Sequence, residues 1–143
     1  MAEECEFPKS NATTDEIKNI LRSFKVIAVV GLSDKPDRPS YHVAEYLQSH
    51  GYKIIPVNPM IPQWKGMKSY PDLKSIPESV DIVDIFRKPA DTPEIVEEAI
   101  SRGAKVIWMQ EGIVNNVAAD RARNAGLQVV MNKCMLKEHR KLI

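Results

Sequence analysis

The most informative stretch of the chain is residues 25–40, which read KVIAVVGLSDKPDRPS. The run from Val26 to Val30 is apolar and mostly β-branched, which is typical of a strand buried on both faces of a parallel sheet. Gly31 then lets the chain turn, and we expect Ser40 to cap a helix that follows. Free N–H groups and the positive dipole end of such a helix favour an anion. The stretch therefore predicts a strand, a phosphate-binding turn and a helix.

This turn differs from the two common phosphate-binding motifs. A dinucleotide fingerprint needs three glycines spaced G-x-G-x-x-G, and a P-loop ends in Gly-Lys followed by Ser or Thr. Gly31 is the only glycine of the turn, and Lys35, Arg38 and Pro39 make the loop longer, stiffer and more basic. The alternative interpretation is that Gly31 serves only as a turn between a strand and a helix.

Four more apolar runs follow, and most of them are preceded by a helical pattern. Gly51, Gly103 and Gly126 stand where a helix must turn back into a strand, which glycine does at low cost. The strands that we expect after the first one cover residues 53–57, 80–86, 105–109 and 127–131. Strands joined by helical crossovers form a parallel sheet with helices on both faces.

A leading helix is also expected, because Thr13 and Glu16 have the spacing of a capping box and apolar residues follow at helical intervals. We expect residues 1–12 before it to form a flexible N-terminal tail. The prediction for residues 1–143 is a single α/β domain, a Rossmann-like, doubly wound, open parallel sheet of about five strands.

Composition excludes several classes of protein. The 143 residues include 20 Lys and Arg against 19 Asp and Glu, whereas a nucleic-acid-binding protein usually has a basic excess. No apolar run approaches the roughly 20 residues that span a bilayer, and the polar N-terminus has no signal core. The two cysteines, Cys5 and Cys134, are too far apart in sequence for a disulfide framework or a zinc site. We expect a cytoplasmic protein without a metal, and the sequence leaves its oligomeric state open, a homo-oligomer included.

The ligand site of a doubly wound sheet lies at the carboxyl ends of its strands, where the strand order reverses. An order of 3-2-1-4-5 among the five expected strands puts this reversal between the first and the fourth. The ends to consider are residues 31–33, 58–59, 86–89 and 109–112. They supply a phosphate turn, cations, amides and one aromatic ring, but no acid–base pair and no nucleophile beside a histidine. We expect no catalytic residues, and we expect His42, His50 and His139 to be surface or capping residues.

The end of the second strand separates two classes of nucleotide. An NAD site usually has Asp or Glu there, to accept hydrogen bonds from the ribose hydroxyls. This chain has Asn58 followed by Pro59, which makes NAD less favoured. A ligand with a ribose phosphate suits the nearby Lys35 and Arg38 better.

Six groups of residues occur in an order and at separations that are specific in combination. They are 29–33 with 38–41, 46–47 with 51–52, 56–59, 81–84 with 86–87, 106–110 with 112–113, and Cys134 with 138–139. In these groups the chain resembles the small CoA-binding protein family, which shares its fold with the CoA-binding domain of the succinyl-CoA synthetase α subunit. The resemblance runs from about Ile17 to Leu142.

The resemblance implies that coenzyme A lies across the strand ends. By analogy, its phosphates would meet the glycine turn, its phosphorylated ribose would lie near the two loop cations, and its pantetheine arm would pass the end of the fourth strand. The residues implied in binding are Gly31, Leu32, Ser33, Lys35, Arg38, Pro39, Ser40, Asn58, Pro59, Phe86, Arg87, Lys88, Met109, Gln110 and Gly112.

Structural interpretations of these residues stay open. Phe86 is either a platform for the base or part of the core, and Arg87 and Lys88 are either ligand contacts or a solvated strand end. Cys134 is either reactive toward the thiol of the ligand or, as we favour, a packing residue.

Three functions remain. The leading one is non-catalytic binding of coenzyme A or a short acyl-CoA. The second is an enzyme or enzyme component that uses the same pocket, either acyl-CoA ligase-like or NAD-dependent. The third is an interaction protein that has lost its ligand.

Overall fold

The structure is a computed structural model of the chain, and it describes residues 6–143. Five parallel strands form one sheet in the order β2-β1-β5-β6-β7, so that the two edge strands are β2 and β7. These strands are β1 (Val26–Val30), β2 (Lys53–Val57), β5 (Ile82–Ile85), β6 (Val106–Met109) and β7 (Gln128–Val130). The predicted Rossmann-like parallel sheet is thereby confirmed.

The position of β5 corrects the expected strand order. It pairs with β1, from Ile27 beside Ile82 to Val30 beside Ile85, whereas the third strand was expected at an edge, outside the second. Strand patterns do not say which strands pair, and right-handed crossovers allow both arrangements. The reversal of strand order therefore lies between β1 and β5, and not between the first and the fourth main strands.

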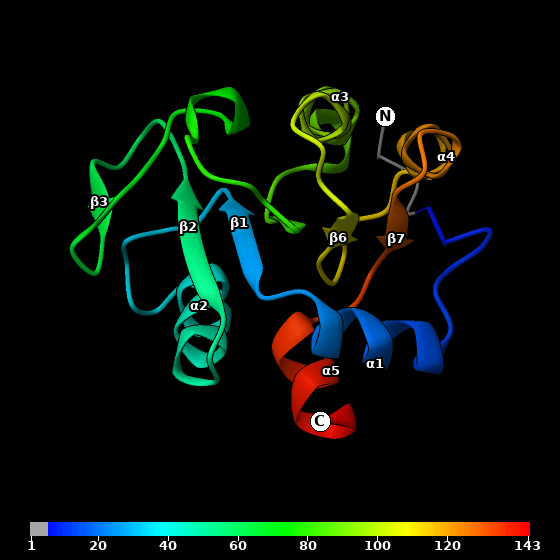
Figure 1. The fold of residues 1–143 in the computed structure, drawn as a ribbon, viewed down its shortest axis with the longest axis horizontal. Helices are drawn as coiled ribbons and strands as arrows, with labels where there is room; N and C mark the ends of the chain where they lie inside the picture. The colour runs from blue at the N-terminus through cyan, green and yellow to red at the C-terminus, as the bar shows by residue number, and fades with distance from the viewer. Residues whose placement is uncertain (1–5) are drawn as a thin grey trace.

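Helices cover both faces of the sheet (Figure 1). Helices α3 (Thr92–Ser101) and α4 (Asn116–Asn124) lie on one face, and α1 (Thr14–Ser23), α2 (Pro39–Ser49) and α5 (Met135–Leu142) lie on the other. Helix α5 follows the last strand and was not among the predicted elements. The sheet is thus the middle layer of three.

The strand β1 shows why both faces are covered. Ala28 and Val30 pack toward α3 and α4, while Ile27 and Val29 pack toward the other three helices. Successive side chains of a strand point to opposite faces, so a continuous apolar run needs two cores. Each fully buried Val or Ile contributes about 1.5–3 kcal/mol relative to an exposed one.

The residues before α1 are held against the sheet edge within the part that the structure describes. The Asn11 side chain donates to the Met131 carbonyl at 2.8 Å and accepts from the Met131 amide at 2.9 Å. Glu6 accepts from the Asn116 side chain at 2.9 Å. The flexible tail expected over residues 1–12 thus differs from the structure over 6–12, and the rest of it lies outside the described residues. The predicted capping box of α1 is confirmed.

The long connection between β2 and β5 carries a small hairpin that was not among the predicted elements. Its strands are β3 (Gln63–Trp64) and β4 (Met67–Lys68), and two 3-10 turns follow, η1 (Leu73–Ser75) and η2 (Pro89–Asp91), the second after β5. Trp64 is buried and meets Tyr41 of α2 edge to face, with ring centroids 5.5 Å apart. The hairpin is therefore packed onto α2, beside the carboxyl ends of β1 and β2.

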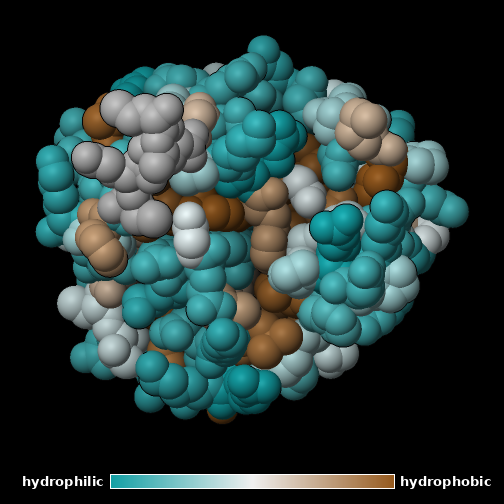
Figure 2. Space-filling model, turned by 180° about the vertical axis from the view of Figure 1, so that it is seen from behind, coloured by the Kyte–Doolittle hydropathy of each residue, from teal (hydrophilic) through white to brown (hydrophobic). Residues whose placement is uncertain are grey.

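The surface carries few exposed large apolar side chains. Seen from behind, it is mostly hydrophilic, with hydrophobic residues in a broken band down the middle (Figure 2). Met60, on the turn after β2, is 85% exposed. Within residues 6–143, no helix is both long and apolar enough to cross a membrane.

Candidate functional site

The reversal point between β1 and β5 is where two strand ends meet at a glycine. Gly31 has φ +89°, and a Cβ built there would lie 2.5 Å from the carbonyl oxygen of Phe86 and 3.0 Å from Cδ of Arg87. Real Cβ contacts are not this short, so only glycine fits. The resemblance implied that the phosphates of a ligand meet this glycine turn. In the structure the group that approaches it is the backbone of the neighbouring strand end.

A groove of about 470 Å³ opens beside this contact. It brings together eight of the residues implied by the resemblance, with three others beside them. Its lining is Gly31, Ser33, Asp34, Lys35, Arg38, Pro39, Ser40, Asn58, Met60, Ile61 and Phe86. Lys35 and Arg38 are exposed, and neither forms an ion pair within residues 6–143. The groove therefore has free positive charge at its mouth.

Ser40 does not cap helix α2. The helix begins after Arg38, which makes no side-chain capping bond, and Ser40 lies inside its first turn. The Ser40 hydroxyl instead accepts a hydrogen bond from the Ser33 N–H at 3.0 Å. The turn after β1 is thus tied to the helix, and the Ser33 amide is already occupied.

Asn58 joins the ends of β1 and β2. Its side-chain nitrogen donates to the Leu32 carbonyl at 3.0 Å, and its side-chain oxygen accepts from the Met60 amide at 2.9 Å. The side chain of Leu32 is fully buried toward α1 and α2. Because both ends of the Asn58 amide are engaged, this residue shapes the groove and leaves Met60 at its rim.

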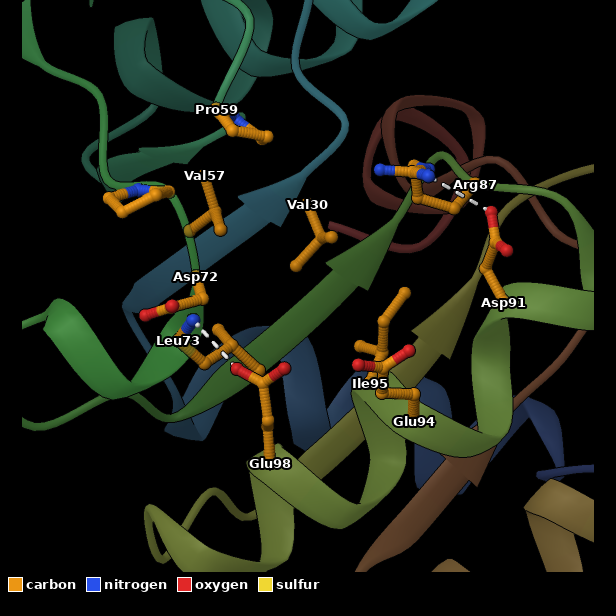
Figure 3. A pocket seen from close by; sticks show the side chains of 11 residues that line it. Val30, Val57, Pro59, Asp72, Leu73, Arg87, Asp91, Glu94, Ile95 and Glu98 are labelled. Carbon is orange, nitrogen blue, oxygen red and sulfur yellow. Dashed lines mark hydrogen bonds and ion pairs between the residues drawn. The ribbon is translucent and has the colours of Figure 1, made fainter.

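A second cavity, of about 160 Å³, lies on the other side of the reversal point (Figure 3). The sheet and the β2–β5 connection supply Val30, Val57 and Leu73, and α3 supplies Glu94 and Glu98. Glu98 accepts a hydrogen bond from the Leu73 amide at 3.1 Å. The cavity thus has an apolar floor and an acidic rim.

Two of the implied residues, Pro59 and Arg87, line this second cavity and not the groove. Arg87 is paired with Asp91 at 3.1 Å, as Figure 3 shows. Its charge is therefore partly compensated, unlike the charges of Lys35 and Arg38.

Besides the buried Leu32, four implied residues line neither cavity. Lys88 is exposed before η2, and Met109 is fully buried in the core toward α3 and α4. The Gly112 amide donates to the Asn132 side chain at 2.8 Å. Gln110 is 3% exposed, so its side chain faces the interior of the protein.

Gln110 takes part in a buried chain of hydrogen bonds that the sequence analysis missed. Its side-chain nitrogen donates to Oδ1 of Asp84 at 2.5 Å, and its side-chain oxygen accepts from the Met135 amide at 3.3 Å. Asp84 is fully buried, and its Oδ2 has no hydrogen-bond partner within the part of the chain that the structure describes. Burial raises the pKa of this carboxyl to about 7, and the bond from Gln110 opposes the rise. The signal in the sequence was one acidic residue within an apolar strand.

His139 is a second group that differs from expectation. It is 7% exposed, not a surface residue, and the Tyr46 hydroxyl lies 2.9 Å from its Nδ1. The rings of His50 and Tyr52 also surround it, with centroids 5.0 and 5.6 Å away. Burial, His50 and Lys25 lower the pKa of His139, in that order. His139 thus occupies a buried position between α5 and α2, where an apolar residue would be expected.

The sheet order, Gly31 and the loop cations define a doubly wound α/β domain with a groove at the carboxyl edge of its sheet that carries Lys35 and Arg38. Comparison with known proteins agrees: the model of the family described as CoA binding domain matches residues 25–140. The chain belongs to this CoA-binding domain family.

Several relatives match nearly the whole chain. A Bacillus subtilis protein named Uncharacterized protein YneT is 43% identical over 129 residues, which are 90% of this chain and 96% of that protein. The structure of a hypothetical protein from Pyrococcus horikoshii OT3 has a TM-score of 0.90 at 44% identity and covers 98% of this chain and 99% of that one.

Other relatives are much longer than this chain. The acetate–CoA ligase [ADP-forming] I subunit alpha of Pyrococcus furiosus is 33% identical over 89 residues, which are 58% of this chain and 19% of that protein. The acetate–CoA ligase [ADP-forming] II of Archaeoglobus fulgidus is 32% identical over 57% of this chain and 12% of its own length. The similarity to these ligases is therefore limited to a small part of each of them.

Proposed function

We propose that this protein binds coenzyme A or a short acyl-CoA at the carboxyl edge of its sheet without catalysing a reaction. The observation that carries this proposal is the groove at the reversal point, with Lys35 and Arg38 unpaired among the described residues at its mouth. Coenzyme A has a diphosphate and a ribose phosphate, and such anions favour a basic loop before a helix. Membership in the CoA-binding domain family supports the same ligand.

The charges of the lining residues indicate which of the two cavities would hold the phosphates. The smaller one has Asp72, Glu94 and Glu98 in its lining, and a phosphate there would meet negative charge. The groove has two cations, Lys35 and Arg38, against one acid, Asp34, and it lies at the start of α2, where the helix dipole is positive. The phosphates therefore belong in the groove, with Phe86 along its wall.

The groove provides fewer suitable contacts for NAD than for coenzyme A. No acidic residue ends β2, and the Asn58 side chain is engaged at both ends, so it has no free acceptor for both ribose hydroxyls. The loop cations favour the ligand with more phosphate. We expect coenzyme A to bind more tightly than NAD.

A thermal shift assay tests this binding. A ligand that binds only the folded state at 100 times its Kd stabilises the protein by about 2.7 kcal/mol, which raises the Tm of a chain of this length by roughly 10 °C. We expect this shift with coenzyme A and acetyl-CoA and a smaller one with NAD, each compared with buffer. No shift with coenzyme A, or an equal one with NAD, would overturn the proposal.

The non-catalytic part is tested separately. The protein alone is incubated with acetate, ATP and coenzyme A, the reactants suggested by the names of the ligase relatives, and acetyl-CoA and ADP are measured. We expect neither product above a heat-inactivated control. Formation of both would favour the enzymatic alternative, with the same groove as its CoA site.

A further inference from the structure

Strand β6 and the residue after it form hydrogen bonds with the segment that leads from β7 into α5. Its Trp108 ring nitrogen donates to the Lys133 carbonyl at 2.8 Å, and its neighbour Gln110 accepts from the Met135 amide. Cys134 lies between these two anchored residues, half-buried, just before the first residue of α5. Its position is therefore set by β6 from both sides.

Of these two anchors, only the bond through Gln110 depends on a titratable group. The Gln110 amide can present its oxygen to Met135 because its nitrogen is held by Asp84. Asp84 lies between Val29 and Trp108 in the register of the sheet, with no exposure to solvent. The orientation of Gln110, and with it the start of α5, follows from the carboxyl group of Asp84.

We propose that Asp84 is a positioning residue which, acting through Gln110, holds Cys134 and the start of α5 in place, and that loss of the Asp84 proton loosens this hold. The proposal goes beyond the proposed function and does not depend on it, because neither Gln110 nor Cys134 lines the groove.

The physical reason is the cost of a buried charge. When Asp84 is protonated, the junction is neutral and Gln110 is the partner of Oδ1. When it is ionised, the bond from Gln110 to Oδ1 strengthens, but Oδ2 has no hydrogen-bond donor among residues 6–143, and such a buried charge is costly in an apolar interior. Opening the start of α5 lets water reach the carboxylate and lowers that cost.

Few charged groups compete at this junction. Burial is the main cause of the raised pKa of Asp84, and no charged side chain of the described residues contributes to it. On the α5 side, the ionisable groups facing the junction are the Cys134 thiol and Lys137, whose ammonium is paired with Glu111 at 2.9 Å. Ionisation of Asp84 is therefore the main change of charge at this junction near neutral pH.

The test measures how fast Cys134 reacts with iodoacetamide between pH 5.5 and 8.5, without coenzyme A, in a parent protein whose other cysteine is removed by Cys5→Ser. The same rates are measured after Asp84→Asn, which keeps the shape of the side chain but cannot ionise. Dividing the parent rate by the variant rate at each pH cancels the ordinary titration of the thiol. Asp81→Asn is the matched control, because Asp81 precedes the same strand but binds the Lys25 and Val26 amides.

We expect the ratio of the parent rate to the Asp84→Asn rate to be near one below pH 6 and to rise severalfold above pH 7. The Asp81→Asn control should show the same pH profile as the parent protein. A ratio that stays constant over the whole range would overturn the proposal.

A second measurement needs no variant. Hydrogen exchange of the Met135 amide, which donates to Gln110, should show a protection factor that falls above pH 7. Constant protection would contradict the proposal even if Asp84→Asn failed to fold. Since neither measurement uses coenzyme A, failure of CoA binding would overturn the proposed function alone.

Discussion

Replacing Gly31 by alanine is the sharpest test of how the two strand ends meet. The substitution adds one carbon atom, which would lie 2.5 Å from the Phe86 carbonyl oxygen at a backbone φ of +89°. Two costs follow, strain of an L-residue in this conformation and overlap with the neighbouring backbone. Since both atoms of the overlap belong to rigid strand ends, neither can move away cheaply.

The expected loss of folding stability is the sum of these two costs. A positive φ costs an L-residue about 1–2 kcal/mol, and overpacking costs about 1–3 kcal/mol more. Gly126→Ala is the matched control, because Gly126 has φ +93° and nothing within 4 Å of an added Cβ. We expect Gly31→Ala to lower stability by about 3–4 kcal/mol, and the control by about 1–2 kcal/mol.

Urea unfolding followed by circular dichroism measures both free energies. On heating, Gly31→Ala should lower the Tm by roughly 10 °C, and Gly126→Ala by less than half of that. Equal losses in the two variants would refute the close contact between Gly31 and Phe86, because strain would then account for both.

Further predictions concern charge and protonation. Removing both Lys35 and Arg38 by alanine substitution should weaken coenzyme A binding roughly fivefold to tenfold and flatten its salt dependence in calorimetry, and an unchanged salt slope would make them solvated loop residues. The folded state lowers the pKa of His139 from 6.5, so protonation of this residue does not reduce the free energy of unfolding above pH 6.5 and reduces it as the pH falls further. His139→Gln should remove this loss of stability in acid, and a loss that persists in the variant would contradict the assignment to His139. Asp84 should change stability with pH in the opposite direction. Its pKa is raised from 3.8 to about 7 in the folded state, so the free energy of unfolding should fall by about 1 kcal/mol per pH unit as the pH rises between these values. Urea unfolding of Asp84→Asn should show no such slope. Cys134 should remain unmodified when the protein is incubated with oxidised coenzyme A and its intact mass is measured, as expected of a packing residue, whereas an adduct that Cys134→Ser abolishes would show that the thiol exchanges with the ligand.

The five main strands could be predicted because each is a continuous apolar run with two buried faces. Residues 26–30 and 53–57 are strands as expected. The strand order could not be predicted, since pairing depends on contacts between residues such as Ile27 and Ile82, which are distant in sequence. Helix α5 was missed because its buried face combines Met135 with a polar residue, His139, and so breaks the apolar periodicity.

The candidate site was predictable to the extent that it follows the strand ends. Gly31, Lys35 and Arg38 line one groove, as their place in the first loop suggested. Gln110 also follows a strand end, yet its side chain turns inward, because Asp84 offers it a buried acceptor. Sequence position gives the edge of the sheet on which a residue lies, whereas the direction of its side chain depends on partners elsewhere in the fold.

The contact between Gly31 and Phe86 also has a mechanical consequence. Both residues follow strands that pair in the centre of the sheet, and the Phe86 amide donates to the Val30 carbonyl at 2.9 Å. The Gly31 amide in turn donates to the Val57 carbonyl at 2.8 Å, so hydrogen bonds hold three strand ends together at the base of the groove. Adjustment to ligands of different size is therefore expected from side chains at the rim, such as the exposed Met60 on the turn after β2.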